Sequence, residues 1–156
     1  MPVLPGEGLV KVVDVEAYIK RMSDPRSGFV FDVTVMELKL ENGSKFVMSN
    51  IPIEIVEAVN VMKNNIDTPR RQSLFIFLMN SEVFRDAAVN AVKEVVIDEI
   101  DQNTGLYTAT LVLEEDGFRL KLKMIPSHAV YLALIAGKPI YVLEKLVHES
   151  YSEEEY

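Results

Sequence analysis

The sequence predicts an α+β domain that is built from two β-β-β-α-α copies, with the strands in a curved or barrel-like sheet and helices packed against it. The first observation is an internal match, because a shift of 74 residues carries Glu41-Asn42-Gly43 onto Glu115-Asp116-Gly117 and Ile51-Pro52 onto Ile125-Pro126. The second is the position of these matches, which fall at a predicted hairpin and a predicted helix start. Such a pseudo-symmetric fold predicts a functional site that draws residues from both copies.

Residue patterns set the limits of the two copies. We expect one domain over residues 1–150, with repeats at about 11–85 and 91–148 and an acidic tail at 151–156. A chain of 156 residues with 49% hydrophobic residues is long enough to bury one sizeable core.

The first copy begins with strands. Residues 11–20 and 29–40 are rich in β-branched and aromatic residues, which favours strands, and Asp24 to Gly28 form the loop between them. Asn42-Gly43 predicts a tight hairpin, since both residues adopt positive φ at little cost, and residues 45–49 return as a third strand.

Two helices are expected to follow. Asn50 is a plausible helix cap and Pro52 lies near the first turn of a helix with apolar residues at helical spacing over 53–62. Residues 64–69 interrupt it, and 70–85 show the apolar stripe of an amphipathic helix.

The second copy repeats this order. We expect strands at 91–100, 106–113 and 119–124, with a hairpin at Asp116-Gly117. Pro126-Ser127-His128 should open an apolar helix over 129–136 that Gly137 closes. Residues 138–142 read as extended and 143–148 as a last helical turn or two.

Composition restricts the partners. The net charge of -8 opposes general attraction to nucleic acid, so binding of RNA or DNA would need a local basic patch. The absence of cysteine excludes disulfides and thiolate metal sites, and the longest apolar run, 129–136, is too short to span a bilayer. We therefore expect a cytoplasmic protein with no membrane contact.

Residues 125–142 carry the most specific motif, Ile-Pro-Ser-His-Ala-Val-Tyr-Leu-Ala-Leu-Ile-Ala-Gly-Lys-Pro-Ile-Tyr-Val. This resembles the bifunctional nuclease domain family, which typically shows Arg-Pro-Ser-Asp-Ala-Ile-Ala-Leu-Ala-Leu followed by Gly-x-Pro-Ile-Tyr-Val. Residues 91–98, 105–109 and 51–53 resemble the same family, so the resemblance spans roughly 11–148. It implies a small α+β fold with a mixed sheet, a homodimer, and nuclease activity on RNA and DNA.

The family's polar positions lie in an Arg-Pro-Leu-Thr-His-Asp-Leu element and in the Arg-Pro-Ser-Asp element. Alignment on Pro69 and Leu74 places the family His on Gln72 and its Asp on Ser73. In the second element, Ile125 and His128 replace the family Arg and Asp beside Ser127. The resemblance therefore carries the catalytic positions over to Gln72, Ser73, Ser127 and His128.

Several of these residues also have simpler interpretations. Arg70 and Arg71 are the natural phosphate contacts, because arginine pairs with phosphate oxygens in a bidentate way, and otherwise they form a solvated helix terminus. Ser127 is better explained as a helix cap than as a nucleophile. His128 either transfers protons or packs locally.

Three further features have mainly structural explanations. The alternating Arg119, Lys121 and Lys123 favour a solvent face over a nucleic-acid track. The acidic residues Asp98, Glu99, Asp101 and Asp116 favour a solvated hairpin end, so no metal ligand is assigned and a divalent cofactor stays open. The very apolar segment 129–141 favours a homodimer.

These observations lead to one function and one alternative. The first is a nuclease that cleaves RNA or DNA weakly or not at all, because the family's His, Asp and Arg positions are substituted, with any activity depending on Arg70, Arg71 and His128. The alternative is a noncatalytic homodimeric module that binds a ligand or a protein.

Overall fold

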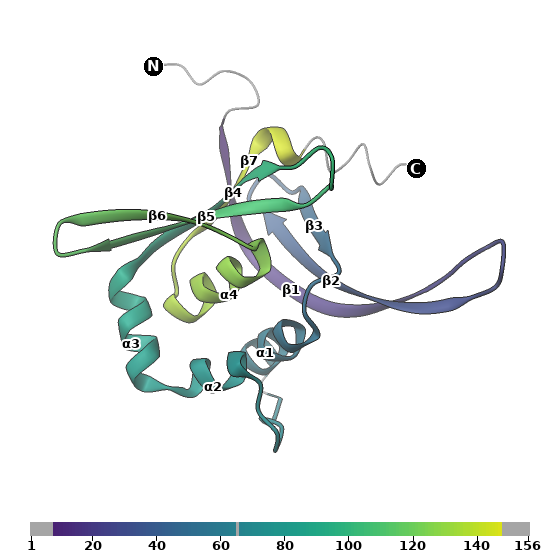
Figure 1. Ribbon diagram of the computed structural model, residues 1–156, viewed down its shortest axis with the longest axis horizontal. Helices are drawn as coiled ribbons and strands as arrows, with labels where there is room; N and C mark the ends of the chain where they lie inside the picture. Colours follow the sequence, from purple (N-terminus) through teal and green to yellow (C-terminus); the bar gives the residue numbers. More distant parts are fainter. Residues whose placement is uncertain (1–7, 65, 148–156) are drawn as a thin grey trace.

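The computed structural model describes residues 8–64 and 66–147, which form a seven-stranded sheet with four helices gathered on one side, while the short helical segment 144–147 lies apart from them (Figure 1). The strands are β1 (Leu9–Ser23), β2 (Val30–Leu40), β3 (Lys45–Ser49), β4 (Val92–Ile100), β5 (Tyr107–Glu115), β6 (Phe118–Met124) and β7 (Ile140–Leu143). The helices are α1 (Ile53–Asn64), α2 (Leu74–Asn80), α3 (Glu82–Ala91) and α4 (Pro126–Ala136).

The sheet is mixed and open. Its strand order is β3-β2-β1-β7-β4-β5-β6, and every neighbouring pair is antiparallel except β4 and β7, which are parallel. The α+β class and the mixed sheet are therefore confirmed. The barrel-like alternative is wrong, because β3 and β6 are free edges and the sheet does not close.

The predicted β-β-β-α-α repeat is only partly present. The strand triplets β1-β2-β3 and β4-β5-β6 are each followed by a helix, α1 and α4, which begin beside Pro52 and Pro126. The second copy then continues with β7, which lies between the two triplets, and residues 144–147 are helical. His148 and the acidic tail 151–156 lie outside the described residues. Duplication of the chain stays a prediction.

The segment predicted as one helix over 70–85 forms two. Ser81 ends α2 and caps α3, because its hydroxyl accepts a hydrogen bond from the Phe84 N–H at 3.3 Å. A serine that bonds the backbone of the following turn favours a helix start over a helix interior. The result is a sharp corner that turns the chain from α2 back toward β4.

The loops between the first two strands of each triplet are built in the same way. The Gly28 N–H donates to the Asp24 carbonyl at 2.8 Å, and the Gly105 N–H donates to the Asp101 carbonyl at 2.7 Å. Both glycines have a φ of 72°. This shared turn is independent of the residue identities that suggested the repeat.

The two hairpin turns differ, despite their matching sequences. At the second hairpin both Asp116 and Gly117 have positive φ, of 50° and 82°, as a two-residue type I′ turn requires. At the first hairpin only Gly43 does, at 87°, while the Asn42 side chain accepts from the Ser44 N–H at 2.9 Å. The expectation of positive φ at Asn42 is wrong, because this turn spans one more residue.

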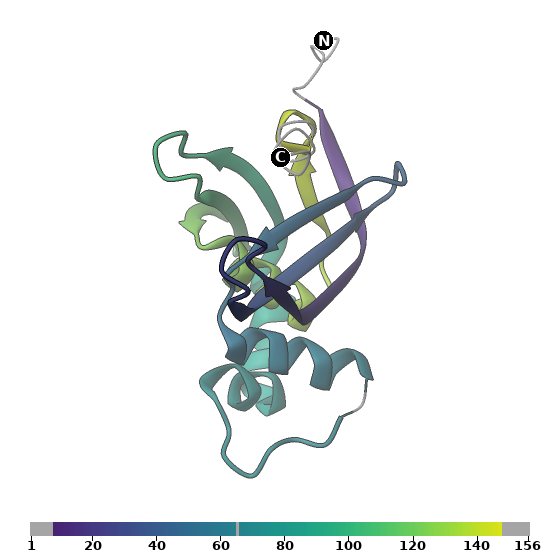
Figure 2. The ribbon, with the colours of Figure 1, turned by 90° about the vertical axis from the view of Figure 1, so that its right-hand side faces the viewer.

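Helix α4 lies between the sheet and the other helices, as Figures 1 and 2 both show. Ala129, Val130 and Ala133 are fully buried and Tyr131 is 1% exposed. Burial on nearly all sides explains why this helix lacks a polar face. Its apolar sequence therefore reflects the core of the domain, and the homodimer predicted from it needs another surface.

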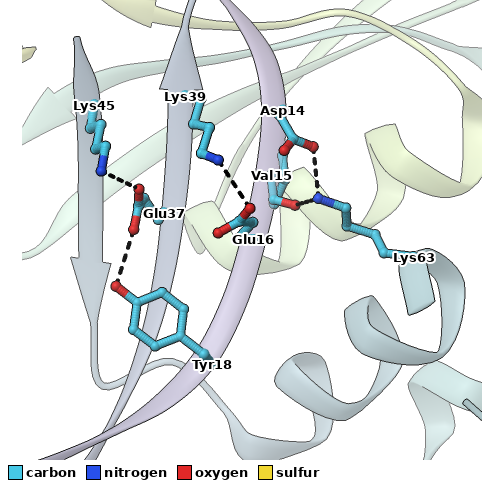
Figure 3. A network of polar contacts seen from close by, with 8 residues as sticks. All are labelled: Asp14, Val15, Glu16, Tyr18, Glu37, Lys39, Lys45 and Lys63. Atoms are coloured by element: carbon cyan, nitrogen blue, oxygen red, sulfur yellow. Dashed lines mark hydrogen bonds and ion pairs between the residues drawn. The ribbon is translucent and has the colours of Figure 1, made fainter.

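Helix α1 covers the part of β1 that lies beyond its pairing with β7. Strand β7 pairs with β1 only over Leu9 to Lys11, so the carbonyls of β1 farther along have no strand partner on that side. Asn60 donates to the Ala17 carbonyl at 3.0 Å, and Lys63 donates to the Val15 carbonyl at 2.5 Å (Figure 3). These bonds satisfy strand carbonyls that β7 cannot reach.

Candidate functional site

A cleft between the start of α1 and the segment before α2 gathers three of the predicted site residues. Arg71, Gln72 and Ser73 line one wall. Ile53, Glu54 and Glu57 of α1 line the other, and the cleft has a volume of about 400 Å³. We call it the α1–α2 cleft.

Local structure explains this arrangement. Glu54 and Glu57 are three residues apart on α1, a spacing that puts both carboxylates on one face of a helix. Ser73 is the N-cap of α2, and its hydroxyl accepts from the Ile76 N–H at 3.2 Å. Capping of α2 therefore fixes the backbone next to Gln72 and Arg71.

The α1–α2 cleft combines one guanidinium, two carboxylates and one carboxamide. The guanidinium of Arg71 suits a phosphate, which it can contact through two parallel hydrogen bonds. The carboxylates of Glu54 and Glu57 suit a proton acceptor or two ligands of a hard divalent cation. Within residues 8–64 and 66–147, no three His, Asp or Glu side chains gather closely enough to hold a metal ion.

His128 lies close to this cleft without lining it. Its ring packs edge-on against Phe75 of α2, with ring centroids 5.5 Å apart. Tyr131, one turn farther along α4, packs on the same Phe75 ring at 5.1 Å and donates a hydrogen bond to the Phe75 carbonyl. The three rings join α4 to α2, so His128 contacts the helix whose cap is Ser73.

Ser127 belongs to a different cleft, of about 610 Å³, which is lined by residues before α1 and residues at the start of α4. Its lining includes Pro52, Pro126 and Ser127, so residues from both strand-helix halves of the chain line one cleft. Ser127 is 3% exposed. It is the second residue of α4, whose N-cap is Ile125 and carries no side-chain cap bond, so the predicted capping role of Ser127 is wrong.

Asn50 also does not cap a helix. It lies before α1 in the left-handed region with a φ of 59°, and its N–H donates to the Thr34 carbonyl at 2.8 Å. Asparagine tolerates this backbone better than most residues with a side chain. The residue thus marks the turn that leads from β3 into α1, beside Pro52.

The remaining basic candidates lie on the surface. Arg70 is exposed and is absent from the lining of the α1–α2 cleft. On β6, Lys123 pairs with Glu99 at 2.7 Å and with Asp98 at 3.7 Å, and Arg119 lies 3.9 Å from Glu94. These pairs support the interpretation of the β6 stripe as a solvent face.

The sequence analysis missed Glu54 and Glu57 as site residues. The available signal was their spacing of three at the start of a predicted helix. What the sequence could not supply was the position of residues 70–73 opposite that helix face, because this depends on how the segment after Asn64 folds back onto α1.

Comparison with protein families matches residues 38–155 to the bifunctional nuclease domain. The chain belongs to this family. The matched region of the bifunctional nuclease domain contains α1, the α1–α2 cleft and α4, and it begins near the end of β2. A comparison with curated proteins found no match. None of the helices among the described residues is long and apolar enough to cross a bilayer.

Proposed function

We propose that this bifunctional nuclease domain binds the phosphodiester backbone of single-stranded RNA or DNA in the α1–α2 cleft and cleaves it only weakly. Family membership supports the reaction class. The observation that carries the proposal is the grouping of Arg71, Gln72 and Ser73 with two carboxylates, Glu54 and Glu57, in one cleft. Two of these residues, Gln72 and Ser73, occupy positions that align with polar residues of the family.

The chemistry follows from the side chains. Cleavage needs positive charge on the phosphate and a proton acceptor or metal-bound water near the attacking oxygen. Arg71 supplies the charge, and Glu57 or Glu54 supplies the proton acceptor. Gln72 can donate hydrogen bonds to a phosphate oxygen but cannot accept the proton, and the Ser73 hydroxyl is engaged in capping α2.

A divalent cation would fit this site only loosely. Glu54 and Glu57 would hold it, and water would have to fill the rest of its coordination shell. A bound cation would supply Lewis acidity toward the phosphate. With two protein carboxylates at most, we expect weak metal affinity and correspondingly slow turnover.

The test is cleavage of fluorescently labelled single-stranded RNA and DNA with magnesium or manganese. We expect slow cleavage that falls at least about tenfold in Arg71→Ala and Glu57→Gln. Arg119→Ala, which removes an arginine paired on the β6 surface, is the matched control and should leave the rate unchanged. The cleavage rates of Arg70→Ala and His128→Ala show whether these two residues, which lie outside the α1–α2 cleft, contribute to activity. Robust cleavage that persists in Arg71→Ala and Glu57→Gln would show that the site lies elsewhere.

The alternative function is a noncatalytic homodimeric binding module, and one observation favours it. The edge strand β6 exposes an apolar face formed by Phe118, Leu120 and Leu122, which are 80%, 53% and 40% exposed. Exposed apolar edges commonly mark association surfaces. Sedimentation at micromolar concentration should show a dimer, and a single species of 17.6 kDa would contradict it.

A cytoplasmic location is part of the proposal and can be checked by cell fractionation.

A further inference from the structure

A third cleft, with an excess of positive charge, lies away from the α1–α2 cleft. It forms where the bulge of β1, between Val12 and Asp14, meets the end of α4 and the start of β7, and its volume is about 470 Å³. Three lysines from three separate segments line it, Lys11, Lys63 and Lys138. We call it the lysine cleft. In a chain of net charge -8, such a grouping is unexpected.

Only one of these lysines is neutralised by an acid of the cleft. Asp14, the one carboxylate among the described lining residues, contacts Lys63 at 2.7 Å (Figure 3). Lys63 also donates to the Val15 carbonyl, so its ammonium group is held in place by β1. Within residues 8–64 and 66–147, neither Lys11 nor Lys138 forms an ion pair. Among the described residues, the ammonium groups of Lys11 and Lys138 therefore have no carboxylate at ion-pair distance, and the Glu41 carboxylate, outside the cleft lining, accepts from the Lys11 backbone N–H at 3.3 Å.

The structure does not need the Lys138 ammonium group to finish α4. Gly137 has a φ of 65° and ends the helix, and its N–H donates to the Leu134 carbonyl at 3.3 Å. The Lys138 N–H donates to the Ala133 carbonyl at 3.0 Å. Backbone bonds thus satisfy these terminal carbonyls, which leaves the half-buried Lys138 side chain available to a ligand.

The rest of the lining suits the organic part of a ligand. Val13 and Leu134 provide accessible apolar surface and Tyr141 provides an aromatic ring. A cleft of this volume with an apolar lining and a few polar groups is typical of sites for small molecules. Lysine ammonium groups bind phosphate as point charges, and aromatic rings stack on bases.

We propose that the lysine cleft binds a nucleoside phosphate, with the phosphates at Lys11 and Lys138 and the base against Tyr141. This site is separate from the α1–α2 cleft and does not depend on nuclease activity.

Isothermal titration of the full chain with ATP, without metal, tests the proposal. We expect one site, with binding about tenfold weaker in Lys138→Ala and in Lys11→Ala and largely retained in Lys138→Arg and Lys11→Arg. Lys121→Ala, which removes an exposed lysine of β6, is the control and should bind like the unaltered chain. Circular dichroism confirms that each variant is folded.

Two further ligands separate the sources of binding energy. Tripolyphosphate should bind more weakly than ATP, and adenosine more weakly still, because each lacks part of the complementary surface. Undetectable ATP binding at millimolar concentration would overturn the proposal. So would equal affinity for ATP and tripolyphosphate, equal losses in Lys121→Ala and Lys138→Ala, or binding of a thymidine oligonucleotide in this cleft without binding of ATP.

Discussion

Replacing Tyr131 by phenylalanine should change how the stability of the domain depends on alkaline pH. Tyr131 is 1% exposed, its ring packs on Phe75, and its hydroxyl donates to the Phe75 carbonyl. Burial raises the pKa of Tyr131 to about 12, against an opposing backbone hydrogen bond from Met79. The change removes the hydroxyl and keeps the ring that joins α4 to α2.

The expected magnitude follows from the shift in pKa. Below pH 10, the ordinary pKa of tyrosine, Tyr131 is protonated in both the folded and the unfolded chain. Above pH 10 the unfolded chain loses the proton first, so stability falls as the pH rises from 10 through about 12. A shift of two units corresponds to about 2.7 kcal/mol, of which about 1.4 kcal/mol is lost by pH 11. At pH 8, loss of the hydrogen bond alone should cost about 0.5–1.5 kcal/mol.

Urea unfolding followed by circular dichroism at pH 8 and pH 11 measures both the cost of losing the hydrogen bond and the loss of stability at alkaline pH. The advantage of the unaltered chain over Tyr131→Phe should shrink by about 1.4 kcal/mol between these pH values. Differences between the two proteins cancel the titration of groups they share. Tyr18→Phe is the comparison variant: burial and the hydrogen bond to Glu37 also raise the pKa of Tyr18, so this change should remove the Tyr18 contribution and retain that of Tyr131. A constant advantage of the unaltered chain between pH 8 and pH 11 would show that the pKa of Tyr131 is not raised by folding.

Substitutions at three other positions test parts of the fold. Lys45 holds the pKa of Glu37 below its usual value through a 3.0 Å contact. The stabilising effect of this pair should be present above about pH 4.5 and lost as the pH falls below it. In Glu37→Gln, the free energy of unfolding should therefore depend less on pH in this acidic range. Gly137→Ala should cost about 1–2 kcal/mol in urea unfolding, because Gly137 has a φ of 65°. Asn50→Gly should be tolerated better than Asn50→Ala, since Asn50 has a φ of 59°, and equal midpoints would contradict this.

The sequence was sufficient for local structure where short-range chemistry decides it. The strand triplets, the hairpins at Gly43 and Gly117 and the end of α4 at Gly137 were predicted, because glycine at positive φ and β-branched runs act within a few residues. The break at Ser81 was missed, since a serine inside an apolar pattern is compatible with both a helix interior and a cap. The place of β7 between the triplets depends on long-range pairing that local patterns do not encode.

The site was predictable only in part for the same reason. Family resemblance identified Gln72 and Ser73, and the structure places both in one cleft together with Arg71. The family resemblance could not predict that Glu57 faces Gln72 and Ser73, or that His128 packs on Phe75 instead of lining the cleft. Those relations are set by how α1, α2 and α4 pack together.

Amide chemical shifts of the isotopically labelled chain, titrated with a short thymidine oligonucleotide and magnesium, are the decisive measurement of nucleic-acid binding in the α1–α2 cleft. We expect shifts concentrated at Glu57 and at Arg71, Gln72 and Ser73, and their disappearance in Arg71→Ala. Shifts that are absent, or that cluster away from the α1–α2 cleft while these residues stay unchanged, would show that nucleic acid does not bind there.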